Sequence, residues 1–386
     1  MENIDKLSAI LEKRGIDICV ISSQENLVYS TGYDLPPPLS ADKAFAEGLP
    51  LAFSILDVSE RKVKLVIQSG LAPSVKKDPA MEIYTWDIYD HFKPYSLYNN
   101  FTKAVDLAFG AVKKPIKTIG IEPNTVPQIL LDIASKHSSG GGKEILNNVS
   151  QDLFAARKIK SDAELAFLSL SAKAADAAQE MLNQCSASYG MTDYEVWFKC
   201  LEAASKVCGS PAVVSGELVT GANTRAVNYP GGPKGITIQK GDAGIMDFSV
   251  RLNGYWCDCC NVVVFGDKAT EHQKHYFDTT EAAFDAAVKA IKPGTKCSEV
   301  FKAAEKAYEK HGEKVPHYIG HQIGCTVNEN PRIVPYDDTI IEQNMVFSLE
   351  PGCYEGGQGV TGSRTEKMVY VTASGCEVFN KFKWGA

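Results

Sequence analysis

Two aspartates, Asp247 and Asp258, lie eleven residues apart in a stretch whose apolar and polar residues alternate as in paired strands. The turn-forming residues Asn253 and Gly254 stand between them, which predicts a β-hairpin. A hairpin would bring both carboxylates to one inward face. Burying two like charges together is costly unless a cation neutralises them, so the pair indicates a site for a divalent metal ion. The alternative is that one or both aspartates cap turns.

Further groups of the same chemical type follow toward the C-terminus. His317 and His321 are four residues apart in a segment broken by glycines, which favours strand and loop over a zincin-type helix. Glu350 ends the apolar run 345–349 and is followed by Pro-Gly, and Glu366 directly precedes another apolar run. A lone carboxylate is normally excluded from an apolar strand. Four carboxylates and one imidazole suit a pair of hard or borderline divalent ions.

The order and local motifs of these residues resemble those of the M24 metallopeptidase superfamily, which includes methionine aminopeptidase, aminopeptidase P, prolidase and creatinase. The matching motifs are D-x10-D, H-x3-H-x-I-G, E-P-G and R-x-E. The resemblance implies the pita-bread fold and a dinuclear metal site. The metal ligands that it implies are Asp247, Asp258, His321, Glu350 and Glu366.

The resemblance also implies a hydrolase similar to Xaa-Pro dipeptidase or aminopeptidase P. Two divalent ions, Mn²⁺ foremost and otherwise Co²⁺, Zn²⁺ or Fe²⁺, would lower the pKa of a bridging water, and the resulting hydroxide would attack an amide or peptide carbonyl. Asp258 and Glu366 would bridge both ions, and Asp247 would hold one of them. Glu350 would share the other with His321 and also shuttle a proton to the leaving nitrogen.

Two residues outside the metal ligands have roles by the same resemblance. His317 would lie beside the substrate and stabilise the tetrahedral intermediate, the alternative being a histidine satisfied in the core. Arg364 would orient a ligand carboxylate, the alternative being a surface charge.

The sequence departs from the family's peptidase pattern at two positions where histidine is common. Asn228 and Asn328 stand there and are candidate substrate-binding residues. An asparagine can hydrogen-bond but cannot carry a proton in acid-base exchange. Ordinary proline-peptide cleavage is therefore in doubt, whereas metal-dependent hydrolysis is not. The alternatives are a creatinase-like hydrolase or lyase of a small non-peptide metabolite and a catalytically inactive binding protein on the same fold.

The chain of 386 residues fits two domains. Residues 1–155 alternate helices with apolar strands and predict an α/β domain, and the segment Asn26 to Tyr33 resembles the creatinase/prolidase-type N-terminal domain. The stretch Arg157 to Glu164 resembles the entry into the catalytic domain, for which residues 156–386 predict an α+β pita-bread fold with antiparallel sheet and flanking helices. By the same resemblance we expect a homodimer, with the loop Pro36 to Pro38 as a candidate contact.

Hydrophobic periodicity and capping signals predict the main secondary structure elements. The expected strands are 18–22, 63–68 and 118–122, with further strands from near residue 212. The expected helices are 4–13, 100–109, 161–184, 193–205, 271–291 and 297–311.

The net charge of -7 and the pI near 5.6 argue against a nucleic-acid-binding surface. Without an apolar run of membrane-spanning length, and with a charged, helix-like start, the chain is expected to be cytoplasmic. The 11 cysteines are odd in number and scattered, so reduced thiols are expected. Cys257 and Cys259 should face away from Asp258 in a strand, while Cys260 shares its face. Direct thiolate ligation of zinc is the alternative, although paired C-x-x-C spacing is missing.

Overall fold

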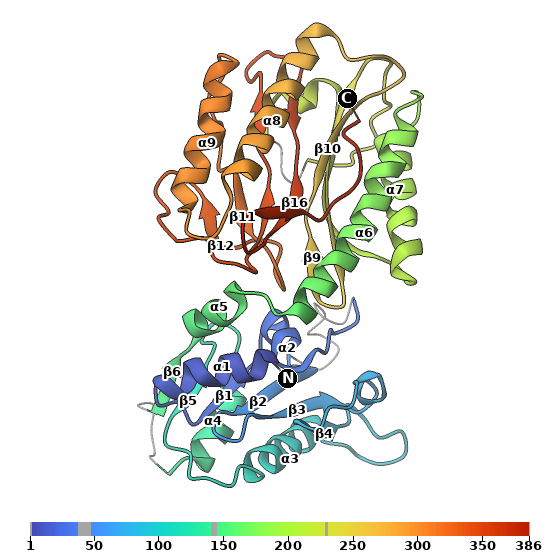
Figure 1. Cartoon of the computed structure of the whole chain (residues 1–386). Coiled ribbons are helices and arrows are strands. Elements are labelled where there is room, and N and C mark those ends of the chain that lie inside the picture. Colours follow the sequence, from blue (N-terminus) through green and yellow to red (C-terminus); the bar gives the residue numbers. More distant parts are fainter. Residues whose placement is uncertain (1, 38–47, 140–144, 228–230, 386) are drawn as a thin grey trace. The chain divides into compact units, whose positions relative to one another are not determined.

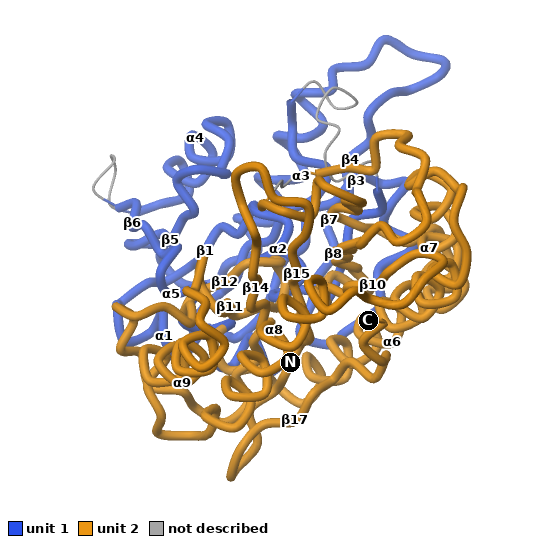
Figure 2. Tube along the Cα trace, turned by 90° about the horizontal axis from the view of Figure 1, so that it is seen from above, with its two compact units in different colours: residues 1–157 blue, residues 158–386 orange. Residues whose placement is uncertain are grey.

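The computed structural model describes residues 2–37, 48–139, 145–227 and 231–385. The chain divides into two compact units, Met1–Arg157 and Lys158–Ala386, which are coloured separately in Figure 2. Each unit has its own hydrophobic core.

The described strands of the first unit form one mixed sheet in the order β4-β3-β2-β1-β5-β6. The central strand β1 pairs antiparallel with β2 and parallel with β5, so the sheet changes direction at its centre. β4 lies parallel to β3 at one edge, and β6 lies parallel to β5 at the other. The strands are β1 (Ile18–Ile21), β2 (Ala52–Asp57), β3 (Lys62–Gln68), β4 (Met81–Trp86), β5 (Ile119–Ile121) and β6 (Leu146–Asn148).

Helices pack on this sheet through apolar stripes. In the first helix Ile4, Leu7 and Leu11 are buried, because residues three or four apart lie on one face of a helix. Phe101 of the third helix packs edge-on against Trp86 at the end of β4. The helices are α1 (Glu2–Lys13), α2 (Gln24–Thr31), α3 (Leu97–Gly110), α4 (Gln128–His137) and α5 (Ser150–Lys158), with a short 3-10 helix at Ala72–Ser74.

The second unit contains two larger sheets and a small one. The first sheet has the order β10-β8-β7, with β9 paired to β8, and the second has the order β12-β11-β13-β16-β17. Its strands are β7 (Val213–Thr220), β8 (Ala243–Leu252), β9 (Tyr255–Cys257), β10 (Cys260–Val264), β11 (Gly320–Gln322), β12 (Glu329–Ile333), β13 (Val346–Leu349), β14 (Gly352–Tyr354), β15 (Gly362–Arg364), β16 (Lys367–Val371) and β17 (Cys376–Val378).

Long helices flank these sheets on their outer sides. Figure 1 shows α6 and α7 beside the sheet that contains β10, and α8 and α9 beside the sheet that contains β11 and β16. Three of the helices begin with capping boxes, in which a hydroxyl and a Glu or Gln side chain satisfy free backbone N–H groups. The helices are α6 (Asp162–Cys185), α7 (Asp193–Cys208), α8 (Glu271–Ala290) and α9 (Cys297–Lys310), with a 3-10 helix at Gly221–Arg225.

The expected hairpin connects β8 to β9. Asn253 and Gly254 at its turn have φ angles of 53° and 82°, the left-handed conformation that a two-residue hairpin turn requires. The other predicted helices and strands occur within a few residues of their expected bounds. The segment Asn26 to Tyr33, for which no element was expected, consists mostly of α2, capped by Ser23 and ended by Gly32 at φ 68°.

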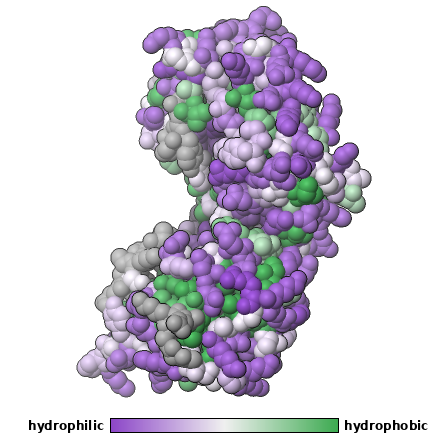
Figure 3. Space-filling view, turned by 90° about the vertical axis from the view of Figure 1, so that its left-hand side faces the viewer, coloured by the Kyte–Doolittle hydropathy of each residue, from purple (hydrophilic) through white to green (hydrophobic). Residues whose placement is uncertain are grey.

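The face drawn in Figure 3 is mostly hydrophilic, with hydrophobic residues in separate clusters. Within the described part of the chain, none of the helices combines the length and apolar character needed to cross a membrane.

Candidate metal centre

The five residues expected to bind metal lie where the two larger sheets of the second unit meet. Asp247 belongs to β8 and Asp258 lies between β9 and β10, while His321 belongs to β11 and Glu350 directly follows β13. Glu366 stands between β15 and β16. Because β8 pairs with β9 and β10, the hairpin folds Asp258 back toward the strand that carries Asp247.

Four of these side chains converge closely. The Nε2 atom of His321 lies 3.1 Å from Glu350 Oε1 and 3.8 Å from Asp258 Oδ2. The potential ligand atoms of Asp258, His321 and Glu366 all lie within 4.8 Å of one another. Asp247 lines the same cavity, and the charge of Asp258 is among the causes that raise the pKa of its carboxyl.

The electrostatics of this cluster are unfavourable without a cation. Burial raises the pKa of Asp247 and Glu366 well above the ordinary range, and repulsion from Asp258 raises both further. Burial also raises the pKa of Asp258, although His321 opposes the shift. Three neighbouring carboxyls are thus driven toward the neutral form.

His321 and Glu350 form a pair in which each favours the charged form of the other. Burial acts to lower the pKa of His321, but the hydrogen bond and charge of Glu350 outweigh it and raise the pKa to about 8. Burial acts to raise the pKa of Glu350, yet His321 outweighs it and the net pKa is lowered. Glu350 is therefore a carboxylate, ready to accept a proton.

One buried carboxylate oxygen of Glu366 allows a test of whether these residues fit a metal ion. Oε2 of Glu366 is buried and has no hydrogen-bond partner among the described residues. A buried carboxylate oxygen without a partner is strongly disfavoured, and a cation would satisfy it. The donor set of carboxylate oxygens and one imidazole is also one that divalent ions use in proteins. The residues present fit the group that the sequence implied.

Neighbouring side chains hold the candidate ligands in fixed orientations. Ser249 donates to Asp258 Oδ1 at 2.7 Å, and Ser348 lies 2.8 Å from Glu366 Oε1. Nδ1 of His321 is 2.9 Å from the carbonyl oxygen of Gln322. With the ring proton on Nδ1, Nε2 is left free to bind a metal.

Arg364 is buried, which excludes the alternative of a surface charge. Its NH2 group donates to Asp247 Oδ2 at 2.8 Å and to Glu217 Oε1 at 2.7 Å. Sequence reasoning did not single out Glu217, although the signal was present: an acidic residue interrupts the run of β7, as at the other carboxylate positions.

His317 lines the same cavity and is tied to its neighbours at both ring nitrogens. Nδ1 lies 2.7 Å from the carbonyl oxygen of Tyr318, and Nε2 lies 3.3 Å from the hydroxyl of Tyr354. Burial lowers the pKa of His317, so the neutral ring, an acceptor at Nε2, predominates. Tyr354, which the sequence reasoning also missed, accepts a hydrogen bond from Arg364 NH1 at 3.3 Å and so links the arginine to His317.

The cavity that these residues share has a volume of about 400 Å³. Asn328 lines it, and its Oδ1 accepts a hydrogen bond from Arg332 NH2 at 2.9 Å. Asn228 lies outside the described residues. The lining consists of Ser215, Val227, Asp247, Ser249, Asp258, His317, Tyr318, His321, Val327, Asn328, Glu350 and Arg364.

The cysteine cluster is arranged as the strand pattern predicted. The Sγ atoms of Cys257 and Cys259 contact Asn380 and Gln179, away from the carboxylates. Burial raises the pKa of the Cys260 thiol well above its ordinary value, and the charges of Arg364 and Asp247 also act on it, which places it on the side of the candidate ligands. All 11 cysteines lie in the described part of the chain and carry thiols rather than disulfides. The cluster of potential metal ligands found among the described residues contains no thiol.

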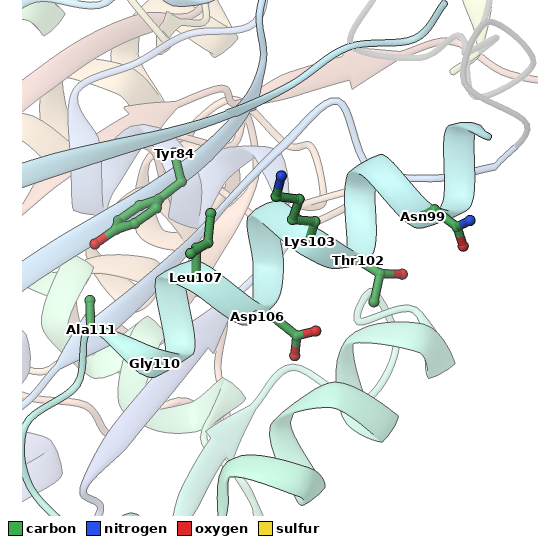
Figure 4. Close-up of a pocket in the computed structure, with 8 residues that line it drawn as sticks. All are labelled: Tyr84, Asn99, Thr102, Lys103, Asp106, Leu107, Gly110 and Ala111. Atoms are coloured by element: carbon green, nitrogen blue, oxygen red, sulfur yellow. The ribbon is translucent and has the colours of Figure 1, made fainter. Parts of the chain in front are cut away.

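A larger cavity, of about 780 Å³, lies in the first unit. Figure 4 shows that Tyr84 reaches it from β4, while the other labelled residues lie on or directly after α3. Asp106 is the carboxylate among its described lining residues, and it is hydrogen-bonded to His137 Nε2 at 3.0 Å. The described lining of this cavity therefore contains one carboxylate and no histidine, unlike that of the cavity in the second unit.

Comparison with known proteins shows similarity along nearly the whole chain. The chain is 26% identical to an Xaa-Pro dipeptidase of Lactobacillus delbrueckii subsp. lactis, over 98% of this chain and 96% of the relative. It is 25% identical to an Xaa-Pro dipeptidase of Pyrococcus furiosus, over 98% of each chain. The fold is similar to that of the prolidase from Pyrococcus horikoshii OT3, with a TM-score of 0.76 and 22% identity over 100% of this chain and 99% of the other. The Xaa-Pro dipeptidase from Bacillus anthracis gives a TM-score of 0.78 at 21% identity, over 100% of this chain and 98% of the other.

Two family profiles match nearly the whole chain. Residues 3–157 match the creatinase/prolidase N-terminal domain, and residues 168–373 match metallopeptidase family M24. The second match alone covers more than half of the sequence, so the chain belongs to metallopeptidase family M24, as a hydrolase with the pita-bread fold and a creatinase-type N-terminal domain.

Proposed function

We propose that this protein is a peptidase that uses two divalent metal ions to hydrolyse a short peptide of the Xaa-Pro type. The observation that carries the proposal is the buried cluster of Asp258, His321 and Glu366, whose ligand atoms lie within 4.8 Å and leave one carboxylate oxygen without a partner. The names of the relatives, Xaa-Pro dipeptidase and prolidase, support the substrate class.

The ions would be held by Asp247, Asp258, His321, Glu350 and Glu366. Carboxylate oxygens dominate this set, so Mn²⁺ is the favoured ion, with Co²⁺, Zn²⁺ or Fe²⁺ as alternatives. Such ions, when bound, lower the pKa of a water molecule and polarise a carbonyl oxygen.

The chain's own residues would handle the protons and the substrate. Glu350 is ionised beside His321 and faces the cavity, so it would take up a proton and pass it to the leaving nitrogen. Arg364 would hold Asp247 in place through its NH2 group. His317 would contact the substrate, and because its neutral ring accepts at Nε2, it would donate to a developing oxyanion only when protonated.

A second candidate function is hydrolysis of a small non-peptide amide, or a lyase reaction on such a compound. The observation that favours it is Asn328, a cavity residue that cannot transfer a proton and whose carbonyl oxygen is already held by Arg332. Asn228, the other proposed substrate-binding residue, likewise cannot transfer a proton.

One experiment separates these functions. The protein is stripped of metal with a chelator, reloaded with Mn²⁺, and given Xaa-Pro dipeptides in parallel with cyclic and guanidino amides. Metal-dependent release of proline is the expected result. Cleavage of the non-peptide amides alone would favour the second candidate. Full metal loading with turnover of neither class would indicate a binding protein.

We also propose that residues 1–155 form the N-terminal domain and residues 156–386 the catalytic domain, which the division of the chain at Arg157 and Lys158 supports. A homodimer is proposed from the resemblance of the N-terminal domain. Of its candidate contact loop, Pro36 and Pro37 are exposed, and Pro38 lies outside the described residues.

A further inference from the structure

Glu217 is a buried carboxylate beside the candidate metal site, and it is not one of the proposed metal ligands. It lies in β7, directly opposite Asp247 in the ladder between β7 and β8, and it is 1% exposed. One oxygen, Oε1, accepts from Arg364 NH2 at 2.7 Å. The other, Oε2, accepts the backbone N–H of Gly231 at 2.8 Å. Both oxygens are thus engaged by the protein.

The side chain of Arg364 is held between two acids. The same NH2 group that contacts Glu217 also donates to Asp247 Oδ2 at 2.8 Å. Arg364 lines the cavity, whereas Glu217 is absent from the described lining and lies behind the guanidinium. Apart from two histidines, Arg364 is the cationic side chain among the described lining residues. A ligand in the cavity therefore meets the arginine with its charge already paired.

The pairing changes the net charge of the loaded site. The four proposed carboxylate ligands carry -4 and two divalent ions carry +4, so the ligands and ions together are neutral. Arg364 alone would raise the total to +1, and Glu217 returns it to zero. A centre with a net positive charge attracts an anionic group such as a peptide's terminal carboxylate, and a neutral centre attracts it less.

We propose that Glu217 is a positioning residue that neutralises Arg364 and thereby directs the site toward peptides with no free carboxylate next to the cleaved bond. Such peptides are longer than two residues or amidated at the C-terminus. This inference rests on the proposed peptidase function. It assigns Glu217 a role through Arg364 and Asp247, without direct contact with the substrate.

The first test compares Ala-Pro with Ala-Pro amide, two substrates that differ in the charge of one group. The wild-type protein is expected to have the higher kcat/KM for the amide. Glu217→Gln leaves Asp247, a proposed metal ligand, as the remaining carboxylate on the Arg364 Nη2 group. The amide-to-acid ratio of kcat/KM should therefore fall by about 10-fold, the effect of one charge a few ångströms away in a partly screened site. A ratio that stays within about two-fold of wild type would overturn the proposal.

Glu164→Gln is the matched control. Glu164 is also buried in the second unit, but its side chain belongs to the capping box of α6 and does not line the cavity. It should leave the amide-to-acid ratio unchanged. An equal change in both variants would mean that the ratio follows general loosening of the fold rather than the charge of Glu217.

The second test measures Mn²⁺ binding by calorimetry on protein stripped of metal. Glu217→Gln should bind Mn²⁺ about 10-fold more weakly, because the negative charge of Glu217 then no longer offsets the guanidinium beside Asp247. The double variant Glu217→Gln, Arg364→Gln restores the charge balance and should recover most of the affinity. A purely structural role of Glu217 predicts no such recovery, and wild-type affinity in Glu217→Gln would contradict the proposal.

The two tests also separate this inference from the proposed function. If the wild type cleaves neither peptide with Mn²⁺ bound, the peptidase function fails, while the Mn²⁺ titrations still decide whether Glu217 offsets Arg364. Should Glu217→Gln not fold, Arg364→Gln and the double variant supply the comparison, since Glu217 is present in the first and absent in the second. Arg364→Gln should then bind Mn²⁺ more tightly than the double variant, because it keeps the negative charge of Glu217. Equal affinities of the two variants would overturn the proposed role of Glu217.

Discussion

Cys260 and Glu366 exchange backbone hydrogen bonds, with N···O distances of 3.1 Å and 2.9 Å, and so join the two ligand-bearing sheets of the catalytic unit. Cys260 begins β10 in the first sheet, two residues after Asp258, and Glu366 directly precedes β16 in the second. This bridge helps to bring two carboxylates from segments more than one hundred residues apart into one cluster.

Asp258→Asn and Glu366→Gln should each abolish turnover with little loss of folding. Each change removes the negative charge of a proposed metal ligand, while the amide keeps the shape of the acid. Metal content, Tm and activity are measured together, with the exposed Glu342→Gln as the control. A variant that loses one metal and still turns over would refute the two-metal mechanism.

The reconstituted protein should bind about two divalent ions per chain, with Mn²⁺ preferred because oxygen donors dominate the site. Elemental analysis of protein stripped with a chelator, reloaded and desalted gives the stoichiometry. The Asp258→Asn variant provides the matched blank. Wild-type protein without bound metal after reloading would rule out the metal centre.

The metal-free protein should lose stability as the pH rises from about 6.5 through about 8. The pKa of His321 is raised from 6.5 to about 8 in the folded chain, so its contribution is fully present below the unfolded value and disappears as the folded group deprotonates. Tm measured across this range should fall, and less so in His321→Gln. Saturating Mn²⁺ should abolish the decline, because a metal ligand must be the neutral imidazole. A Tm that rises over this window in metal-free wild type would contradict the assignment.

Gly352→Ala should lower kcat/KM by about 10²-fold, because an added methyl displaces the substrate-side groups. A Cβ at Gly352 would lie 2.6 Å from His317 Nε2 and 2.4 Å from the Tyr354 hydroxyl. Gly375→Ala is the control, since a Cβ there meets no atom within 4 Å. Steady-state kinetics and circular dichroism distinguish misplacement from unfolding. Unchanged kinetics in Gly352→Ala would show that neither group needs its present position.

Restoring histidine at both asparagine positions should raise activity on Xaa-Pro dipeptides. A positioned acid-base group contributes about 10²- to 10⁴-fold, so Asn228→His with Asn328→His should increase kcat/KM by about 10²-fold. The measurement is kcat/KM for Ala-Pro in the wild-type protein and in the double variant. Fast cleavage by the unchanged protein, with a lower rate in the double variant, would show that the asparagines already suit the peptide.

The protein should be a homodimer, because its N-terminal domain resembles those of family members whose partner chain covers the catalytic mouth. Light scattering at micromolar concentration measures the mass directly. Replacing Pro36 and Pro37 with serine should weaken association if the loop forms the contact, and an exposed change elsewhere, Glu342→Gln, should not. A monomeric mass for the wild type would count against the dimer.

Local sequence determined the parts of the site that depend on local structure. The residues Asn253 and Gly254 specified the hairpin because few other residues tolerate positive φ. Each candidate carboxylate ligand was visible as a charge that interrupts an apolar strand. The resemblance to the family's motifs implied the order of the metal ligands and the fold. Strand alternation also placed Cys260 on the side of the carboxylates and Cys257 away from them, since side chains alternate between faces.

Only the tertiary structure decided which of these groups meet, and through which intermediaries. Glu217 is 147 residues from Arg364 in the chain, and its carboxylate gains a role only because β7 pairs with β8 and places it behind the guanidinium. Tyr354 likewise joins Arg364 to His317 through one hydroxyl. A local sequence pattern indicates whether one strand is buried. The balance of charges depends instead on distances between strands, which only the folded chain determines.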